Sequence, residues 1–65
     1  MALTKREQEI LELIANELTT EQIAHFLNIS IPTVESHRRN MFRKLGVQSV
    51  VGLVKEALKN GWIQV

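Results

Sequence analysis

Residues 20–45, TEQIAHFLNISIPTVESHRRNMFRKL, decide the fold of this chain. Their apolar side chains recur at helical spacing, at Ile23, Ala24, Leu27, Ile29, Val34, Met41 and Leu45. Small Ala24 suits a close approach of two helices, and Asn28 suits a left-handed backbone in the turn that follows. The stretch therefore predicts a short helix, a tight turn and a longer basic helix, which is the order of a helix-turn-helix.

Capping residues set the expected helix boundaries on both sides of this stretch. Thr4 with Glu7, and Thr19 with Gln22, have the spacing of a capping box, in which two side chains satisfy free amides of the first turn. The remaining caps are expected at Ser30, Gly46, Ser49 and Asn60-Gly61. We expect helices at about 4–17, 20–27, 31–44 and 50–59. The fold class is thus all-α, a single four-helix bundle-like domain over residues 1–65 with a central helix-turn-helix.

Composition argues against several classes of function. The chain has 65 residues and 45% hydrophobic content, enough for one small core but too little for a buried catalytic cleft of ordinary size. It has no cysteine, and its apolar runs are far too short to span a membrane. His25 and His37 lack a second ligand at helical spacing, and no serine is placed as a nucleophile. We therefore expect no catalytic residue, no metal site and no cofactor.

The charge is distributed unevenly, although the net charge is only +1. Residues 31–45 carry four cations against one acid, whereas residues 4–18 carry two cations against four acids. On a helical wheel, Val34, Met41 and Leu45 form the stripe that faces the core. The opposite arc holds Glu35, Ser36, Arg39, Asn40 and Arg43. Such side chains pair with base edges in a major groove, so the arc indicates a DNA-reading helix.

Four strings give the chain a family resemblance over nearly its full length. They are LTKREQEIL (3–11), QIAHFLNIS (22–30), TVESHRRNMFRKLGV (33–47) and KEALKNGWI (55–63). With them the chain resembles the LuxR/FixJ-type DNA-binding domain, found at the C-terminus of many bacterial response regulators and quorum-sensing regulators. The resemblance implies that helix 31–44 enters the major groove of double-stranded DNA. It also implies a homodimer formed largely through helix 50–59.

The resemblance assigns roles to individual positions of this sequence. Base contacts are implied for Glu35, Ser36 and Arg39. Phosphate contacts are implied for Thr33, Arg43, Lys44, Gln48 and Ser49. Phosphate contacts set register and most of the affinity, whereas base contacts set the sequence preference.

The chain departs from the family pattern at three places. Many members have Lys where this chain has Glu35, and a carboxylate in a phosphate-rich groove needs a cytosine amino group as its partner. We therefore expect a half-site preference different from that of Lys-bearing relatives. Val50 and Val51 replace a common Arg-Thr pair, so one cation near the phosphates is lost. Phe26 lies off the core stripe of its helix, and either tucks under a loop or meets a partner domain.

Helix 50–59 has more apolar surface than one core contact needs. In a monomer a second apolar face is a liability, whereas in a dimer it becomes the interface. We expect the interface to include Val50, Val51, Val54 and Leu58, with Gly52 permitting close approach of a second backbone.

Glu7 lies in the middle of the apolar stripe of the first helix, where an unpaired carboxylate is costly. The capping box gives it one amide. We expect its second partner to be Arg38, whose wheel position leans toward the edge of the core. The alternative is an ordinary capping glutamate with access to solvent.

These features predict sequence-specific DNA binding in bacterial transcription regulation, in the cytoplasm, at half-sites spaced by about one turn of DNA, roughly 10 base pairs. The chain begins almost at its first cap, which favours a domain taken from a longer regulator with an N-terminal receiver or sensor domain, although standalone members exist. One rival is a promoter-reading module of sigma-factor region 4 type, which lacks the dimer face. The other is a helical interaction or dimerisation domain that meets an acidic partner without binding DNA.

Overall fold

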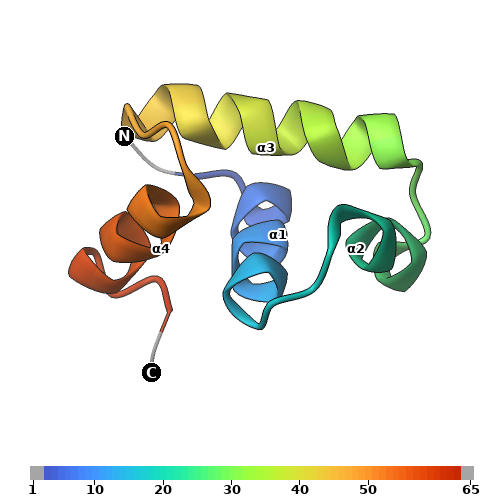
Figure 1. Ribbon diagram of the computed structural model, residues 1–65, viewed down its shortest axis with the longest axis horizontal. Coiled ribbons are helices and arrows are strands. Elements are labelled where there is room, and N and C mark those ends of the chain that lie inside the picture. Colours follow the sequence, from blue (N-terminus) through green and yellow to red (C-terminus); the bar gives the residue numbers. More distant parts are fainter. Residues whose placement is uncertain (1–2, 64–65) are drawn as a thin grey trace.

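The computed structural model describes residues 3–63, in which four helices are joined by short turns. The helices are α1 (Lys5–Ala15), α2 (Thr20–Leu27), α3 (Ile31–Leu45) and α4 (Val50–Lys59). α3 lies across one side of the molecule, and the other three helices pack beneath it (Figure 1). α1 is central and contacts all three, with α2 and α4 on either side of it. The expected all-α fold is confirmed, and none of the described helices has the length and apolar character needed to cross a membrane.

The helix starts follow from the predicted caps. Both capping boxes are formed: the Thr4 amide donates to Glu7 Oε1 at 2.9 Å, and the Thr19 amide donates to Gln22 Oε1 at 2.8 Å. The hydroxyls of Ser30 and Ser49 accept amide hydrogens from the first turns of α3 and α4. Because these bonds are local, the sequence alone fixes where each helix begins.

Left-handed residues lie at or just after the ends of all four helices, including Gly61, with a φ of 73°, after α4. Asn28 has a φ of 58° and Gly46 a φ of 67°, as expected for the turn and the C-cap. Glu17 also has a positive φ, of 66°. The sequence does not predict this conformation, because the residue is neither glycine nor asparagine. The expected first helix, 4–17, is therefore too long at both ends: Thr4 is its N-cap, and α1 ends at Ala15 because the backbone reverses at Glu17.

The core lies where α1 meets the other three helices. Its buried hydrophobic residues are Ile10, Leu11, Ile14, Ile23, Ala24, Val34, Met41, Leu53 and Ala57. Leu27, Ile29 and Leu45, which share the predicted apolar pattern, are partly buried and pack against this core. Among the described residues Glu7 is the only buried charged side chain, with 3% of its surface exposed. The core thus holds one face of α3 and leaves the other face free.

Candidate nucleic-acid interface

The outer face of α3 collects the three residues expected to contact bases. Glu35, Ser36 and Arg39 are all exposed, whereas Val34 and Met41 on the opposite face are fully buried. The other helices lie on one side of α3, so this face runs free along the length of the helix (Figure 1). The face therefore presents a carboxylate, a hydroxyl and a guanidinium to whatever approaches it.

Arg43 continues this face one turn beyond Arg39. Its side chain is exposed, and Nη2 donates a hydrogen bond to Asn40 Oδ1 at 2.6 Å. The bond restrains the guanidinium without neutralising its charge, because its acceptor is an uncharged amide. Arg39 and Arg43 thus form a positive ridge along the exposed face, as the helical wheel predicts.

Three further residues expected near phosphates are also exposed, at two helix starts. Thr33 lies in the first turn of α3, where its hydroxyl is 2.7 Å from that of Ser30. Gln48 and Ser49 precede α4, and Ser49 Oγ accepts the Gly52 amide at 3.1 Å. Helix starts carry free amides and a partial positive charge, so both places suit an anion.

Lys44 differs from the other expected phosphate contacts. Its ammonium Nζ lies 2.8 Å from Glu7 Oε1, and only 29% of its side chain is exposed. The expectation that Glu7 pairs with Arg38 is therefore wrong: the partner is Lys44, six residues further along α3. The alternative of a solvated capping glutamate is also wrong, because the Glu7 side chain is only 4% exposed.

This contact determines the ionisation of Glu7. Burial alone raises the pKa of the carboxyl, since it penalises the charged form. The hydrogen bonds from Lys44 and from the Thr4 amide and hydroxyl, together with the charge of Lys44, outweigh burial and lower the pKa below its ordinary value. Glu7 is thus an ionised anchor for α3 at neutral pH.

Arg38 makes a contact that sequence reasoning missed. Its Nη1 donates to Thr20 Oγ1 at 2.7 Å, which joins the middle of α3 to the first residue of α2. The two ion pairs within residues 3–63 are Arg6–Glu9 and Lys44–Glu7, so neither neutralises Arg38. The positive charge of Arg38 is therefore uncompensated within the described chain.

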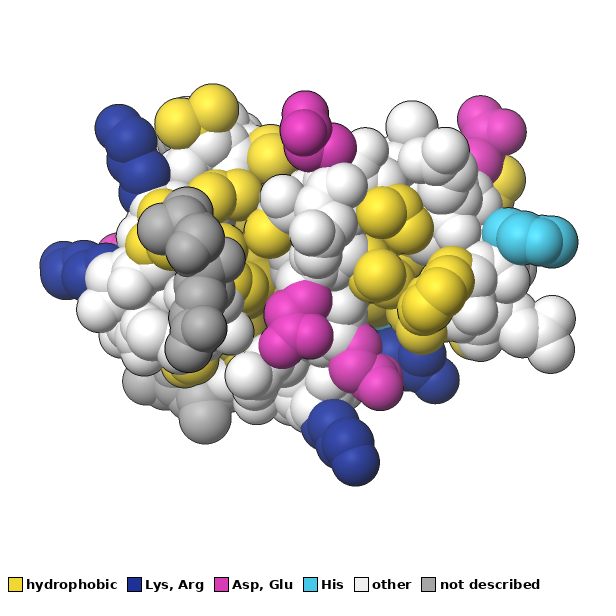
Figure 2. Space-filling model, turned by 90° about the horizontal axis from the view of Figure 1, so that it is seen from below, with side chains coloured by type: hydrophobic (Ala, Val, Ile, Leu, Met, Phe, Trp, Pro, Cys, Tyr) yellow, Lys and Arg dark blue, Asp and Glu magenta, His cyan; other side chains and the backbone are white. Residues whose placement is uncertain are grey.

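The face turned away from α3 has a different character. Figure 2 shows acidic side chains over α1 in the middle of that face, between two groups of hydrophobic side chains, with Lys and Arg side chains beside them and at the edge. That face therefore carries both signs of charge, whereas the ridge of Arg39 and Arg43 on α3 is positive and attracts a polyanion. The molecule therefore presents one face suited to nucleic acid, despite its net charge of only +1.

The four residues expected at a dimer interface lie on α4. Val51 is 63% exposed, Val50 and Leu58 are each 39% exposed, and Val54 is half-buried. A Cβ at Gly52 would lie 3.3 Å from Val47 Cβ of the same chain. The glycine therefore leaves room for the turn between α3 and α4, a role within the chain that the sequence pattern did not predict.

Phe26, on α2, lies outside this interface. Phe26 is 70% exposed, so it does not tuck under a loop. It borders an open, mostly apolar hollow with Leu18 and His25.

Within residues 3–63 no group of three or more His, Cys, Asp or Glu side chains is placed to hold a metal ion.

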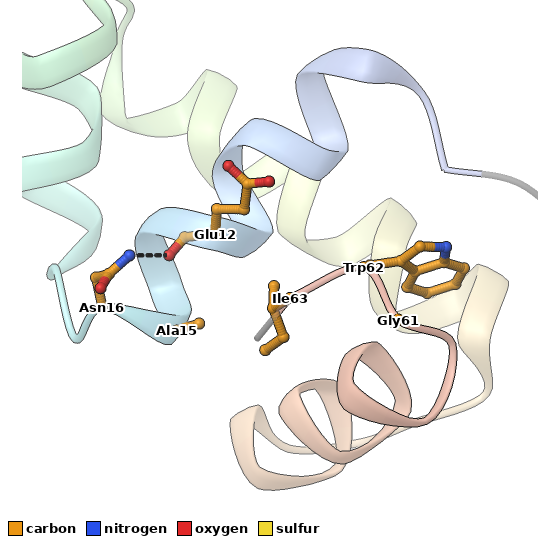
Figure 3. A pocket seen from close by; sticks show the side chains of 6 residues that line it. All are labelled: Glu12, Ala15, Asn16, Gly61, Trp62 and Ile63. Carbon is orange, nitrogen blue, oxygen red and sulfur yellow. Dashed lines mark hydrogen bonds between the residues drawn. The ribbon is translucent and has the colours of Figure 1, made fainter. Parts of the chain in front are cut away.

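A second hollow lies between the end of α1 and the segment that follows α4 (Figure 3). Its lining residues are Glu12, Ala15, Asn16, Gly61, Trp62 and Ile63. The Asn16 amide group donates to the Glu12 backbone oxygen at 2.9 Å, which satisfies the end of α1. The side-chain amide of Asn16 in this hollow thus serves the end of α1.

Comparison with known proteins identifies the chain's relatives. The family model for luxR-family bacterial regulatory proteins matches residues 1–57. The uncharacterized response regulatory protein YgeK of Escherichia coli K12 is 52% identical over 59 residues, which are 91% of this chain and 40% of YgeK. The chain thus spans two fifths of the length of this relative.

Two solved structures share the fold. The transcription factor GerE superposes with a TM-score of 0.90 at 35% identity, covering 98% of this chain and 97% of GerE. A VqmA–ligand–DNA complex from Vibrio cholera superposes with a TM-score of 0.88 at 35% identity, covering 100% of this chain and 28% of VqmA. The architecture described above is therefore that of these regulators.

Proposed function

Because the chain belongs to the luxR family of bacterial regulatory proteins and is a helix-turn-helix DNA-binding domain, we propose that it reads a specific operator as a homodimer. Each protomer places α3 in a major groove, and two protomers meet through α4 on successive half-sites. The outcome of binding is transcription regulation in a bacterial cytoplasm.

The observation that carries this proposal is the free outer face of α3. A 15-residue helix is about 22 Å long, and its diameter matches a major groove about 12 Å wide. Arg39 provides a bidentate donor for guanine, Ser36 hydrogen-bonds to several base edges, and Glu35 accepts from the cytosine amino group. These three side chains give the helix the chemistry to distinguish base pairs.

Phosphate contacts at both ends of α3 hold the helix in register. We assign them to Thr33 in its first turn, Arg43 in its last turn, and Gln48 and Ser49 at the start of α4. Lys44 is left out of this set because its ammonium is engaged by Glu7. The assigned contacts are independent of sequence and provide the salt-dependent part of the affinity.

The dimer follows from the exposed apolar residues of α4. Val50, Val51 and Leu58 expose 39%, 63% and 39% of their surfaces, and half-buried Val54 lies between them on the helix. Burial of this patch against a second copy removes apolar surface from water. The patch of one 10-residue helix is small, so self-association without DNA is weak.

Relatives with longer chains suggest the context of this domain. YgeK is described as a response regulatory protein, and this chain matches 40% of it. We propose that a receiver or sensor domain precedes the domain in its full-length protein and controls its dimerisation.

The decisive experiment is selection of duplexes from a random pool, followed by titration of the selected duplex at several salt concentrations. A DNA reader prefers the selected sequence over a scrambled one by about 1000-fold or more, and its affinity falls with salt. Paired half-sites about 10 base pairs apart should bind more tightly than a single one. Binding of one half-site as tightly as two favours a sigma-type monomer, and loss of all duplex binding favours a protein-interaction domain.

A further inference from the structure

Arg38 and Lys44 lie on opposite flanks of the core stripe of α3, and their surroundings differ in charge. The Lys44 ammonium lies 2.8 Å from the buried carboxylate of Glu7, so its positive charge is neutralised within the fold. Arg38 meets only a hydroxyl, that of Thr20, at 2.7 Å. A hydroxyl orients a guanidinium without neutralising it, so the positive charge of Arg38 remains available to an anion.

Arg38 bonds to the Thr20 hydroxyl although an acidic side chain, Glu35, lies close to it in the sequence of α3. Glu35 precedes Arg38 by three residues on α3, a spacing at which helix side chains meet. Neither ion pair within the described chain involves Glu35, and Arg38 turns instead toward α2. The carboxylate thus stays on the reading face, and the guanidinium stays at the joint between α2 and α3.

In helix-turn-helix complexes the first helix crosses the DNA backbone while the second lies in the groove. The first residue of α2 therefore lies where a phosphate passes. A guanidinium offers five N–H donors in a planar fork that matches two phosphate oxygens. The Arg38–Thr20 bond occupies one of them and leaves others for the DNA.

We propose that Arg38, held by the Thr20 hydroxyl, binds a backbone phosphate at the α2 side of the groove. Thr20 is the positioning residue, because its hydroxyl fixes the guanidinium at the helix joint. This inference rests on the proposed DNA binding and adds a contact on the flank opposite Lys44. The contact is to the sugar–phosphate backbone, so it raises affinity for every sequence equally.

The test compares Arg38→Gln with the wild type on the selected duplex and on a duplex of scrambled sequence. Loss of a phosphate contact lowers the slope of log affinity against log salt by about 0.9 per protomer. Affinity for both duplexes should fall by the same factor, so their ratio stays constant. An unchanged slope in a folded variant overturns the proposal, as does a changed ratio.

Several controls keep the result unambiguous. Lys59→Gln removes a cation from the last turn of α4, the end away from α3, and should leave the slope unchanged (Figure 1). If Arg38→Gln loses its cooperative melting transition, Arg38→Met keeps the apolar stem and repeats the slope test. If the wild type shows no preference for any duplex, the proposed function itself fails. If the wild type prefers the selected duplex but Arg38→Gln leaves the salt slope unchanged, the inference about Arg38 fails and the proposed function stands.

The positioning role of Thr20 is tested separately, by measuring the affinity for DNA when its hydroxyl is removed and restored. Thr20→Val keeps the shape and the Arg38 charge but removes the acceptor, so affinity should fall about threefold with the salt slope retained. Thr20→Ser restores the hydroxyl and should restore the affinity. Wild-type affinity in Thr20→Val overturns the positioning role.

Discussion

Lys44 Nζ lies 2.8 Å from Glu7 Oε1, and this contact joins the last turn of α3 to the first turn of α1 across 37 positions of sequence. The same oxygen accepts the Thr4 amide at 2.9 Å. One carboxylate thus caps α1 and ties the last turn of α3 to its first turn. The packing of the reading helix on α1 therefore includes a buried charged contact as well as the apolar core.

Removing the cation from this pair should be costly. In Lys44→Met, Glu7 remains buried without a counter-charge, so we expect the free energy of unfolding to fall by about 2–3 kcal/mol. Urea unfolding followed by circular dichroism measures the change. The matched control is Glu9→Gln, which breaks the exposed Arg6–Glu9 pair at 3.6 Å and should cost under about 1 kcal/mol. Equal losses in the two variants would contradict the anchoring role of Glu7.

The lowered pKa of Glu7 makes this part of the stability depend on pH. The folded chain binds the Glu7 proton less readily than the unfolded chain, whose glutamate has a pKa of about 4.3. The stabilisation is therefore complete well above about pH 4.3 and is lost as the pH falls through this value and the lower folded pKa. Urea midpoints of wild type and Glu7→Gln should converge as the pH is lowered through about 4.3 and on through the lower folded pKa. A constant gap between them would show that Glu7 ionisation contributes nothing.

Local patterns predicted the caps and the exposed face of α3, because both depend on residues within one or two turns. Thr4, Thr19, Ser30 and Ser49 each bond to an amide three residues ahead. The wheel likewise placed Arg39 and Arg43 outward, since a single helix fixes which side chains share a face.

The partner of Glu7 was not predictable in the same way. A wheel gives the angle of Arg38 and Lys44 about the axis of α3, but not which neighbouring helix lies on which flank. That depends on how α1 packs, which is set by core residues far apart in the sequence. The left-handed Glu17 was missed for a related reason, because its conformation is imposed by the turn and not favoured by glutamate itself.

Substitutions of Asn28 test whether the turn between α2 and α3 depends on the left-handed backbone at this position. Its φ of 58° suits asparagine and glycine, whereas alanine pays about 1–2 kcal/mol for its Cβ in this conformation. Asn28→Ala should therefore lower the melting temperature more than Asn28→Gly. Both variants lose the same side-chain amide, so equal losses would mean that the backbone conformation is unimportant.

Glu35 should determine the half-site preference. In Glu35→Lys an exposed acid on the reading face becomes a cation, so affinity for duplexes of any sequence should rise on the order of tenfold. The preference for cytosine at the contacted position should be lost, because lysine accepts no hydrogen bond from its amino group. Selection from a random pool with both proteins measures the change. An unchanged preferred sequence would show that Glu35 does not contact a base.

Val51 tests the dimer face of α4, since it is the most exposed residue of the predicted interface at 63%. Val51→Glu introduces a charge that is solvated in the monomer and must be desolvated in the dimer. Stability of the isolated domain should therefore stay within about 0.5 kcal/mol of the wild type. Affinity for paired half-sites should fall by about tenfold relative to a single half-site. The single half-site is the internal control, because repulsion between the new carboxylate and DNA affects both duplexes. If the ratio of the two affinities is unchanged, α4 does not form the interface.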